Sequence, residues 1–310
     1  MRVTTAVVDS PYIHMMQLRH FLACDILPLV AVLLSPLYFK YLYSGWFEIG
    51  LCVAFWFVTG IGITVGYHRL FTHRGFECTR PVQAVLAVVA AMAAQGGVTS
   101  WAAIHRYHHE QSDKPGDLHS PNLHGEGWRN RARGLLHSHF TWMSRHSYPN
   151  AVRYVPDILR NSMLSMINRY YYYWIVLGLI IPTALGALYH QDLRGAISGL
   201  MWGGIFRIFV VEHIIWSVNS LGHMFGSRPY DTKENSHNMG IFALATLGEC
   251  WHNNHHQFVS SPNFGLHWYK LDPGYWFIKG LQFTGLAWEL RVPKAAQIAN
   301  ETGRLVNAAQ

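Results

Sequence analysis

The stretch that decides the fold is residues 46–73, WFEIGLCVAFWFVTGIGITVGYHRLFTH, in which a long apolar run leads directly into two histidines. As an α-helix the apolar part, residues 46–67, would be about 33 Å long, which matches the roughly 30 Å hydrocarbon core of a bilayer. Its one charged residue is Glu48. The sequence therefore predicts a membrane-spanning helix that delivers His68 and His73 at the membrane surface.

Three further apolar stretches have spanning length: residues 21–43, 170–190 and 195–218. Ser44 and Gly45 alone separate the first span from the second, and the short polar stretch 191–194 separates the third from the fourth. Such short connections predict two helical hairpins, which return the chain twice to its starting side.

A fifth apolar stretch, at about residues 81–100, is uninterrupted only over residues 84–94. Runs of that length are more typical of interfacial or buried helices than of spans. A fifth span would also place the histidines on its two sides in opposite compartments. We therefore expect an interfacial helix.

Composition supports a membrane protein. The 310 residues are 50% hydrophobic and only 13% charged, whereas globular chains carry about 25% charge. The net charge of +7 reflects topology more than nucleic-acid binding, because 19 of the 24 Lys and Arg residues lie in the two large loops. By the positive-inside rule both loops and both termini face the cytoplasm.

These observations predict an all-α fold with four transmembrane helices in two hairpins and a cytosolic helical cap. The cap would be formed by residues 68–169 and 219–296, and the whole chain, 1–310, would be one domain. The four cysteines are far apart and form no CxxC pair, so neither a disulfide framework nor a zinc ribbon is indicated.

Histidine is unusually frequent, with 20 residues against 17 acids, and it gathers in three clusters: HRLFTH at 68–73, HRYHH at 105–109 and HNNHH at 252–256. On an α-helix His105, His108 and His109 fall at about 0°, 300° and 40°, a single stripe. His252, His255 and His256 repeat the pattern. Each triplet can serve two adjacent metals, because neighbouring histidines diverge by about 100°.

The spacing of the other candidates is less regular. His68 and His73 are about 140° apart on an ideal helix, so they are expected to reach different metals or to straddle a helix end. Asn219 and His223 close the fourth span at an i, i+4 spacing. Nine histidines exceed the four ligands of one structural zinc, so the count favours two metals. The metalloprotease signature HExxH does not occur.

The clusters and their surroundings resemble the integral-membrane fatty acyl desaturases, specifically the stearoyl-CoA desaturase-like (delta-9) branch in a bacterial form. The resemblance runs from about residue 46 to 292 and is strongest in GITVGYHRLFTHRGF, HRYHHEQSDKPGDLHSP, VNSLGHMFGSRPYD, GECWHNNHH and DPGYWFIKGLQFTGLAWELRVP. VNSLGH with the downstream RPYD narrows the match from the wider histidine-box enzymes to this branch.

The resemblance implies two irons and assigns their ligands. The first iron would take His68, His105, His252 and His255, with Asn219 reaching it through a water. The second would take His73, His108, His109, His223 and His256. Asp117, His119 and Glu249 would orient ligand imidazoles from behind.

The resemblance also implies the reaction. A reduced di-iron centre would use dioxygen to remove two hydrogens from a saturated acyl chain and leave a cis double bond, by default at delta-9. The substrate would be an acyl thioester or acyl lipid. Electrons would come from a separate ferredoxin or b-type cytochrome with its reductase, because the sequence holds neither an HPGG haem motif nor a cysteine cluster.

Selectivity along the acyl chain would come from a bent tunnel. Gln95 and Trp101 match tunnel-lining positions of the family, and Ile215 stands where a threonine is expected. Trp216 is a further candidate for the tunnel lining. Trp56 or Phe57, about three turns before His68, would plug the tunnel end.

Two alternatives stay open. The same irons would serve a hydroxylase, or an acetylenase acting on a carrier-bound chain. A membrane metal transporter or sensor is more remote, because the spans hold few ionisable residues and no repeated pair of them. The expected location is the bacterial cytoplasmic membrane, with the active site on the cytoplasmic side.

Overall fold

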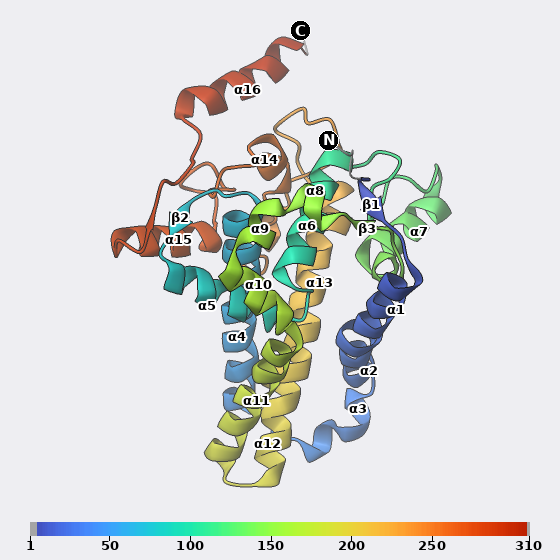
Figure 1. The fold of residues 1–310 in the computed structure, drawn as a ribbon, viewed down its shortest axis with the longest axis vertical. Helices are drawn as coiled ribbons and strands as arrows, with labels where there is room; N and C mark the ends of the chain where they lie inside the picture. Colours follow the sequence, from blue (N-terminus) through green and yellow to red (C-terminus); the bar gives the residue numbers. More distant parts are fainter. Residues whose placement is uncertain (1–4, 309–310) are drawn as a thin grey trace. The chain divides into compact units, whose positions relative to one another are not determined.

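The computed structural model describes residues 5–308, and side chains through residue 301. The chain divides into two compact units. Unit 1 comprises Met1–Ile63, Ala84–Trp101 and Met143–His213, and unit 2 comprises Thr64–Gln83, Ala102–Trp142 and Ile214–Gln310. The regular structure of both units is almost entirely helical, with two short two-stranded pairs (Figure 1), which confirms the predicted fold class.

Unit 1 contains the long apolar helices of the chain's first and third spans together with several short elements. They are β1 (Val7–Val8), α1 (Pro11–His20), the π-helical η1 (Phe21–Ile26), α2 (Leu27–Leu33), α3 (Ser35–Tyr38), the 3-10 turn η2 (Phe39–Tyr41), α4 (Trp46–Ile61), most of α5 (Arg80–Ala91), β3 (Tyr148–Pro149), α8 (Ala151–Tyr154), α9 (Pro156–Arg160), α10 (Ser162–Arg169), α11 (Tyr171–His190), α12 (Leu193–Gly199) and the π-helical η5 (Leu200–Phe206). Strand β1 pairs antiparallel with β3.

The elements of unit 2 carry all the histidine clusters. They are the π-helical η3 (Gly62–Thr72), which unit 2 contains from Thr64 onward, β2 (Glu77–Cys78), α7 (Trp128–His139), the 3-10 turns η6 (Leu221–His223) and η7 (Gly240–Phe242), α14 (His252–Gln257), α15 (Pro273–Phe283), β4 (Ala287–Trp288) and α16 (Ala295–Ala308). Helices α6 (Val98–Gln111) and α13 (Arg207–Ser220) begin in unit 1 and end in unit 2, and the turn η4 (Thr141–Ser144) is also divided. Strand β2 pairs antiparallel with β4.

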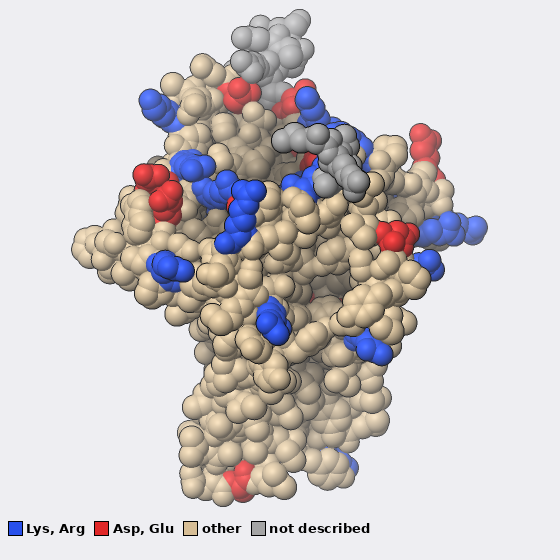
Figure 2. Space-filling view, in the orientation of Figure 1, with Lys and Arg blue, Asp and Glu red and all other residues tan. Residues whose placement is uncertain are grey.

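Four helical runs are long and apolar enough to span a membrane: Pro11–Leu33, Trp46–Thr72, Tyr171–His190 and Leu193–His223. Helix α5, Arg80–Ala91, is shorter and ends nine residues before the predicted limit of the interfacial helix. In Figure 2 the visible face of the α11–α12 hairpin is almost bare of charge until its tip, as expected of a surface that contacts lipid.

The first span begins and ends about ten residues earlier than predicted. Ser10 caps it, because its side chain accepts a hydrogen bond from the Ile13 N–H at 3.2 Å, and the run ends at Leu33. Pro36 explains the end: proline has no N–H to donate, and its ring clashes with the carbonyl four residues earlier. The connection to α4 is consequently longer than the predicted two-residue turn.

Helices α11 and α12 meet through glycines. A Cβ on Gly199 would lie 2.1 Å from the Pro182 carbonyl oxygen, and one on Gly186 would lie 2.2 Å from the Gly195 carbonyl oxygen. Small residues of this kind let membrane helices approach each other closely. Pro182 lies at this contact, and the Gly178 carbonyl, which Pro182 leaves without a helical donor, accepts from Arg207 Nη2 at 3.1 Å.

Substituting Gly199→Ala is expected to force the α11–α12 pair apart and to destabilise the protein by about 1–3 kcal/mol. The matched control is Gly50→Ala on α4, where an added Cβ meets no described heavy atom within 4 Å. Apparent melting temperatures in one detergent, at one scan rate, provide the comparison. An equal loss in both variants would contradict the packing argument.

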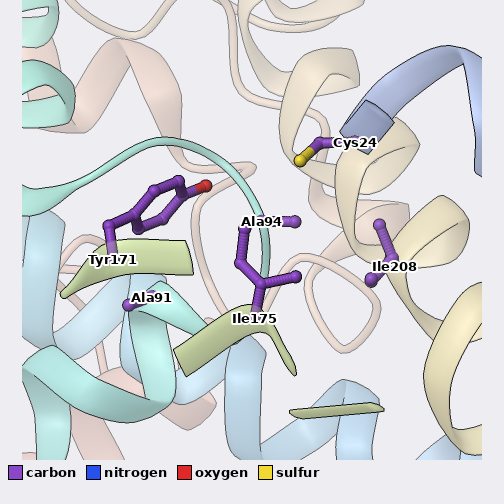
Figure 3. Packing of buried hydrophobic residues seen from close by; sticks show 6 residues of the cluster. All are labelled: Cys24, Ala91, Ala94, Tyr171, Ile175 and Ile208. Atoms are coloured by element: carbon purple, nitrogen blue, oxygen red, sulfur yellow. The ribbon is translucent and has the colours of Figure 1, made fainter. Parts of the chain in front are cut away.

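The described interior of unit 1 combines an apolar cluster with a few buried ionisable residues, Arg207 among them. A cluster of Cys24, Ala91, Ala94, Tyr171 and Ile208 packs with Ile175 (Figure 3). Arg207 is fully buried and donates hydrogen bonds to the carbonyls of Met92, Gly178 and Gly203 at 2.6, 3.1 and 3.2 Å. Turning the guanidinium inward is the usual arrangement of a charge within membrane helices.

Candidate metal centre

His68 and His73 face the same cluster because the second span ends as a π-helix. Segment η3 covers Gly62–Thr72, and the His73 N–H donates to the His68 carbonyl at 3.1 Å, an i to i+5 bond. A π-turn places residues five apart on one face, and the two ring centroids lie 4.8 Å apart. The spacing left two expectations, that these histidines reach different metals or that they straddle a helix end. The structure agrees with the second, because His73 directly follows η3, which ends at Thr72, and both histidines belong to one group of potential ligands.

The other ligand candidates come from three elements of unit 2. Helix α6 carries His105, His108 and His109, η6 ends at His223, and α14 begins at His252 and carries His255 and His256. The third box follows a tight turn in which Gly248 has a φ of 96°. A Cβ there would lie 2.2 Å from Asp272 Oδ1, so this position requires glycine.

The nine histidines form two groups in which the potential ligand atoms lie within 4.8 Å of one another. We call them cluster A (His68, His73, His105, His109, His255) and cluster B (His108, His223, His252, His256). The clusters adjoin, since the rings of His109 and His256 are stacked with centroids 4.4 Å apart.

This grouping corrects the ligand partition that the resemblance implied, which joined His252 to cluster A ligands and His73 and His109 to cluster B ligands. Side chains four apart on a helix share a face. His105 and His109 therefore stay together in cluster A, and His252 and His256 stay together in cluster B. The middle histidine of each box, His108 or His255, crosses to the other cluster.

The nitrogens are arranged as ligands of an ion and not as a hydrogen-bond network. His255 Nε2 lies 3.0 Å from the Nε2 atoms of both His68 and His109, and His109 Nε2 lies 2.9 Å from His105 Nε2. One ring proton cannot satisfy all these contacts. Imidazoles bound at 2.0–2.1 Å around one metal have neighbouring nitrogens about 2.8–3.4 Å apart, from octahedral to tetrahedral geometry, so the residues fit a metal.

Cluster B has the same character. His223 Nε2 and His252 Nε2 are 3.0 Å apart. The Nε2 atoms of His108 and His256, like that of His73 in cluster A, are buried without a hydrogen-bond partner among the described residues. A buried lone pair without a donor is costly, and a cation would satisfy each of them.

Most of these imidazoles are neutral, which is the form that binds metals. Burial, reinforced by the neighbouring histidines, lowers the pKa of six of them well below the usual value: His73, His105, His109, His252, His255 and His256. Burial also acts on His108, but the charge of Asp117 outweighs it and raises the pKa of His108.

Carboxylates contact the Nδ1 atoms of several of the candidate ligand histidines. Glu249 Oε2 contacts His68 Nδ1, Asp117 Oδ1 lies 3.3 Å from His108 Nδ1, and Asp113 Oδ2 lies 2.9 Å from His223 Nδ1. Such partners fix the tautomer so that Nε2 presents its lone pair. The ring of His119 lies tilted against that of His108, with centroids 4.4 Å apart, and the backbone N–H of His119 donates to Asp117 Oδ1 at 3.2 Å. These are the contacts expected of residues that orient a ligand.

Sequence reasoning missed Asp113 and Glu234. Asp113 follows the second box by four residues, and the short spacing of acids in SDKPGD was the available signal. Glu234 lies in a loop, with Oε1 3.5 Å from His256 Nδ1 and Oε2 3.7 Å from His223 Nδ1, and nothing in its local sequence marks it. Burial alone would raise the pKa of Asp113, but the hydrogen bond with His223 outweighs it and holds that pKa below its usual range.

Sequence reasoning also missed Arg69, which supports Glu249. Arg69 is completely buried. It donates to Asp272 Oδ1 at 2.8 Å and to Glu249 Oε1 at 3.3 Å, and its guanidinium lies 4.0 Å from the centroid of the Phe264 ring. A continuous chain of contacts therefore runs from Asp272 through Arg69 and Glu249 to His68.

Asn219 is half-buried in the last turn of α13, one helical turn before His223. The expected tunnel residues are divided between the units. In unit 1 Gln95 Nε2 donates to the Val211 carbonyl at 3.4 Å, Trp101 and Trp56 are half-buried, and Phe57 is 42% exposed. In unit 2 Ile215 is half-buried and Trp216 is buried against Phe140, with ring centroids 5.7 Å apart.

Two adjoining histidine clusters that could hold metal, on a chain with four helices of spanning length, are the features of a membrane protein with a candidate metal centre. The chain belongs to the fatty acid desaturase family, whose model matches residues 44–284. It is therefore an enzyme that desaturates fatty acyl chains, as its resemblance to the integral-membrane desaturases predicted.

Several characterised proteins are similar to this chain. A hex-5-enoyl-[acyl-carrier protein] acetylenase of Moorena producens is 44% identical over 293 residues, which cover 94% of this chain and 91% of that protein. An sn-1 stearoyl-lipid 9-desaturase of Anabaena variabilis is 33% identical over 298 residues, which cover 95% and 100%. Delta-9 acyl-lipid desaturase 2 of Arabidopsis thaliana is 31% identical over 265 residues, which cover 86% and 80%.

Proposed function

We propose that this enzyme is an oxygen-dependent di-iron desaturase that introduces a cis double bond, by default at delta-9, into a saturated acyl chain. The observation that carries the proposal is the pair of clusters with five and four converging imidazoles. Cluster A would hold one iron and cluster B the other, with Asn219 contributing through a water. Imidazole is a good ligand for iron, although it also suits zinc, copper and nickel.

When bound, the iron pair supplies the oxidising power for removing hydrogen from an unactivated methylene, with dioxygen and two external electrons. The protein's contribution is geometric and electrostatic. Glu249, Asp113 and Asp117 hold the Nδ1 protons of three ligands, so that their Nε2 atoms point into the clusters. The burial of most of the clusters excludes bulk water from the oxidising centre.

The acyl chain is proposed to lie in a tunnel lined by Gln95, Trp101, Ile215 and Trp216. Burial contributes about 0.8 kcal/mol per methylene, which anchors the chain without selecting a carbon, so the shape of the tunnel must select it. Trp56 is the better candidate for the plug at the tunnel end, because Phe57 is 42% exposed on its helix.

A carrier-bound substrate is a second candidate, and one specific observation favours it. The similarity to the Moorena acetylenase, at 44% identity, exceeds the 33% to the Anabaena lipid desaturase. In that case the enzyme would act on an acyl chain attached to a carrier protein and continue from alkene to alkyne. Hydroxylation at the same centre is the remaining variant.

The cellular setting follows from the same family. Electrons are proposed to come from a ferredoxin or a b-type cytochrome with its reductase. The excess of Lys and Arg in the two large loops favours a cytoplasmic orientation of both loops, and with them the metal centre, in a bacterial membrane.

Product analysis tests the proposal. Purified enzyme with a reducing system is given saturated acyl lipid, saturated acyl coenzyme A, saturated acyl carrier protein and enoyl carrier protein in parallel, and the acyl chains are measured by mass spectrometry. The proposal predicts a loss of two hydrogens from at least one saturated donor, with the double bond between carbons 9 and 10. Loss of four hydrogens, or of two from an enoyl carrier substrate only, would identify the acetylenase. Gain of one oxygen would identify a hydroxylase.

A further inference from the structure

The two histidine clusters have very different surroundings. Three carboxylates lie against cluster B. Asp113 contacts His223, Asp117 contacts His108, and Glu234 lies within 3.7 Å of both His223 and His256. All three are held in place by other hydrogen bonds. Asp113, for example, accepts from the Asn235 N–H at 2.7 Å and from Asn122 Nδ2 at 2.9 Å.

Within the described part of unit 2, cluster A has one carboxylate partner, Glu249 at His68. Its charge is offset by Arg69, which is buried and 3.3 Å away. Among the described residues of this unit, three of the four cluster B histidines therefore have a carboxylate partner, against one of the five cluster A histidines.

We propose that the two clusters bind metal unequally: cluster B, with Asp113, Asp117 and Glu234 behind it, holds its ion more tightly and favours the higher oxidation state, and cluster A releases its ion first. The inference rests on the proposed function, which places one iron in each cluster. The three carboxylates are positioning residues, since they act on the ion through histidine ligands.

Two physical effects point the same way. A carboxylate at Nδ1 makes the imidazole a stronger donor and fixes its orientation, and losing such a partner costs about 10- to 100-fold in metal affinity. Three of the four cluster B histidines have such a carboxylate partner, whereas in the described part of unit 2 one of the five cluster A histidines does. Buried negative charge also stabilises a cation directly, and more so an ion of higher charge. Together they outweigh the one additional imidazole of cluster A.

The test is stepwise chelation of the full-length enzyme loaded with ⁵⁷Fe. Iron per chain is measured by mass spectrometry at each chelator concentration, and Mössbauer spectra are recorded for fully loaded and half-loaded samples. We expect two phases separated by at least about 10-fold in chelator, and one iron environment in the half-loaded sample. The last iron retained is expected to be that of cluster B.

A matched pair of variants identifies the site. Asp113→Asn is expected to lower the affinity for the retained iron by about 10- to 100-fold. Glu249→Gln is expected to lower only the affinity for the iron that leaves first. Because Asp113 also orders its loop, Glu234→Gln is a second variant, and Asp113→Glu is expected to restore part of the retention.

Three results would overturn the inference. Release of both irons in one phase would do so and leave the di-iron function intact. The inference would also fail if Glu249→Gln lowered the affinity for the retained iron while Asp113→Asn and Glu234→Gln left that affinity unchanged. A chain that never holds two irons would overturn both the inference and the proposed function.

Discussion

Replacing His108 with alanine is expected to abolish turnover and to remove about one metal ion per chain. His108 is the residue of the second box that crosses into cluster B, where its buried Nε2 has no partner among the described residues. The substitution leaves three imidazoles for that ion and deprives Asp117 of the ring it orients. Metal content by elemental analysis and product formation by mass spectrometry provide the two readouts.

The control for this variant is His267→Ala. His267 belongs to neither cluster and stacks on Tyr269, with ring centroids 5.3 Å apart, so both metals and turnover should be retained. If the His108 variant kept both metals, or if the His267 variant lost one, the cluster assignment would be wrong.

Replacing Arg69 with methionine is expected to destabilise the protein by about 3–5 kcal/mol, the usual cost of removing one partner of a buried ion pair. The methionine is similar in length but leaves Glu249 and Asp272 buried without their shared cation. It also removes the contact with the Phe264 ring. The apparent melting temperature in detergent, followed by tryptophan fluorescence at one scan rate, measures the loss.

Arg80→Met is the matched control, because Arg80 is exposed at the start of α5 and should change stability little. The metal-free forms of both variants are compared, so that loss of metal does not contribute to the difference. Equal melting temperatures for the two variants would show that Arg69 does not support this part of the fold.

Much of the fold could be predicted because membrane spans depend on local properties, namely length and apolar composition. The third span was predicted at residues 170–190 and observed at Tyr171–His190. The first was misplaced because hydropathy does not register the effect of Pro36 on the helix end. The second and fourth run past the predicted limits, to Thr72 and His223, since polar histidines continue a helix that hydropathy treats as finished.

The site was predicted less completely than the fold. All nine histidines were identified from spacing and resemblance, and they do converge. The division into two clusters that the resemblance implied differs from the observed grouping at His73, His109 and His252. A π-helical turn brings His73 to His68, and an α-helical wheel does not show this. His109 and His252 follow the i, i+4 relation to His105 and His256, which was not given priority. Arg69, Asp113 and Glu234 act over long sequence separations, which local patterns do not register.

The most direct test of the account is the iron content of the purified wild-type enzyme, measured with its ⁵⁷Fe Mössbauer spectrum. The two clusters of five and four imidazoles predict two irons per chain, in two distinguishable nitrogen-rich environments, and loss of both irons in a variant carrying His105→Ala and His252→Ala together. One iron or none in active enzyme, or two irons that survive this double substitution, would contradict the account.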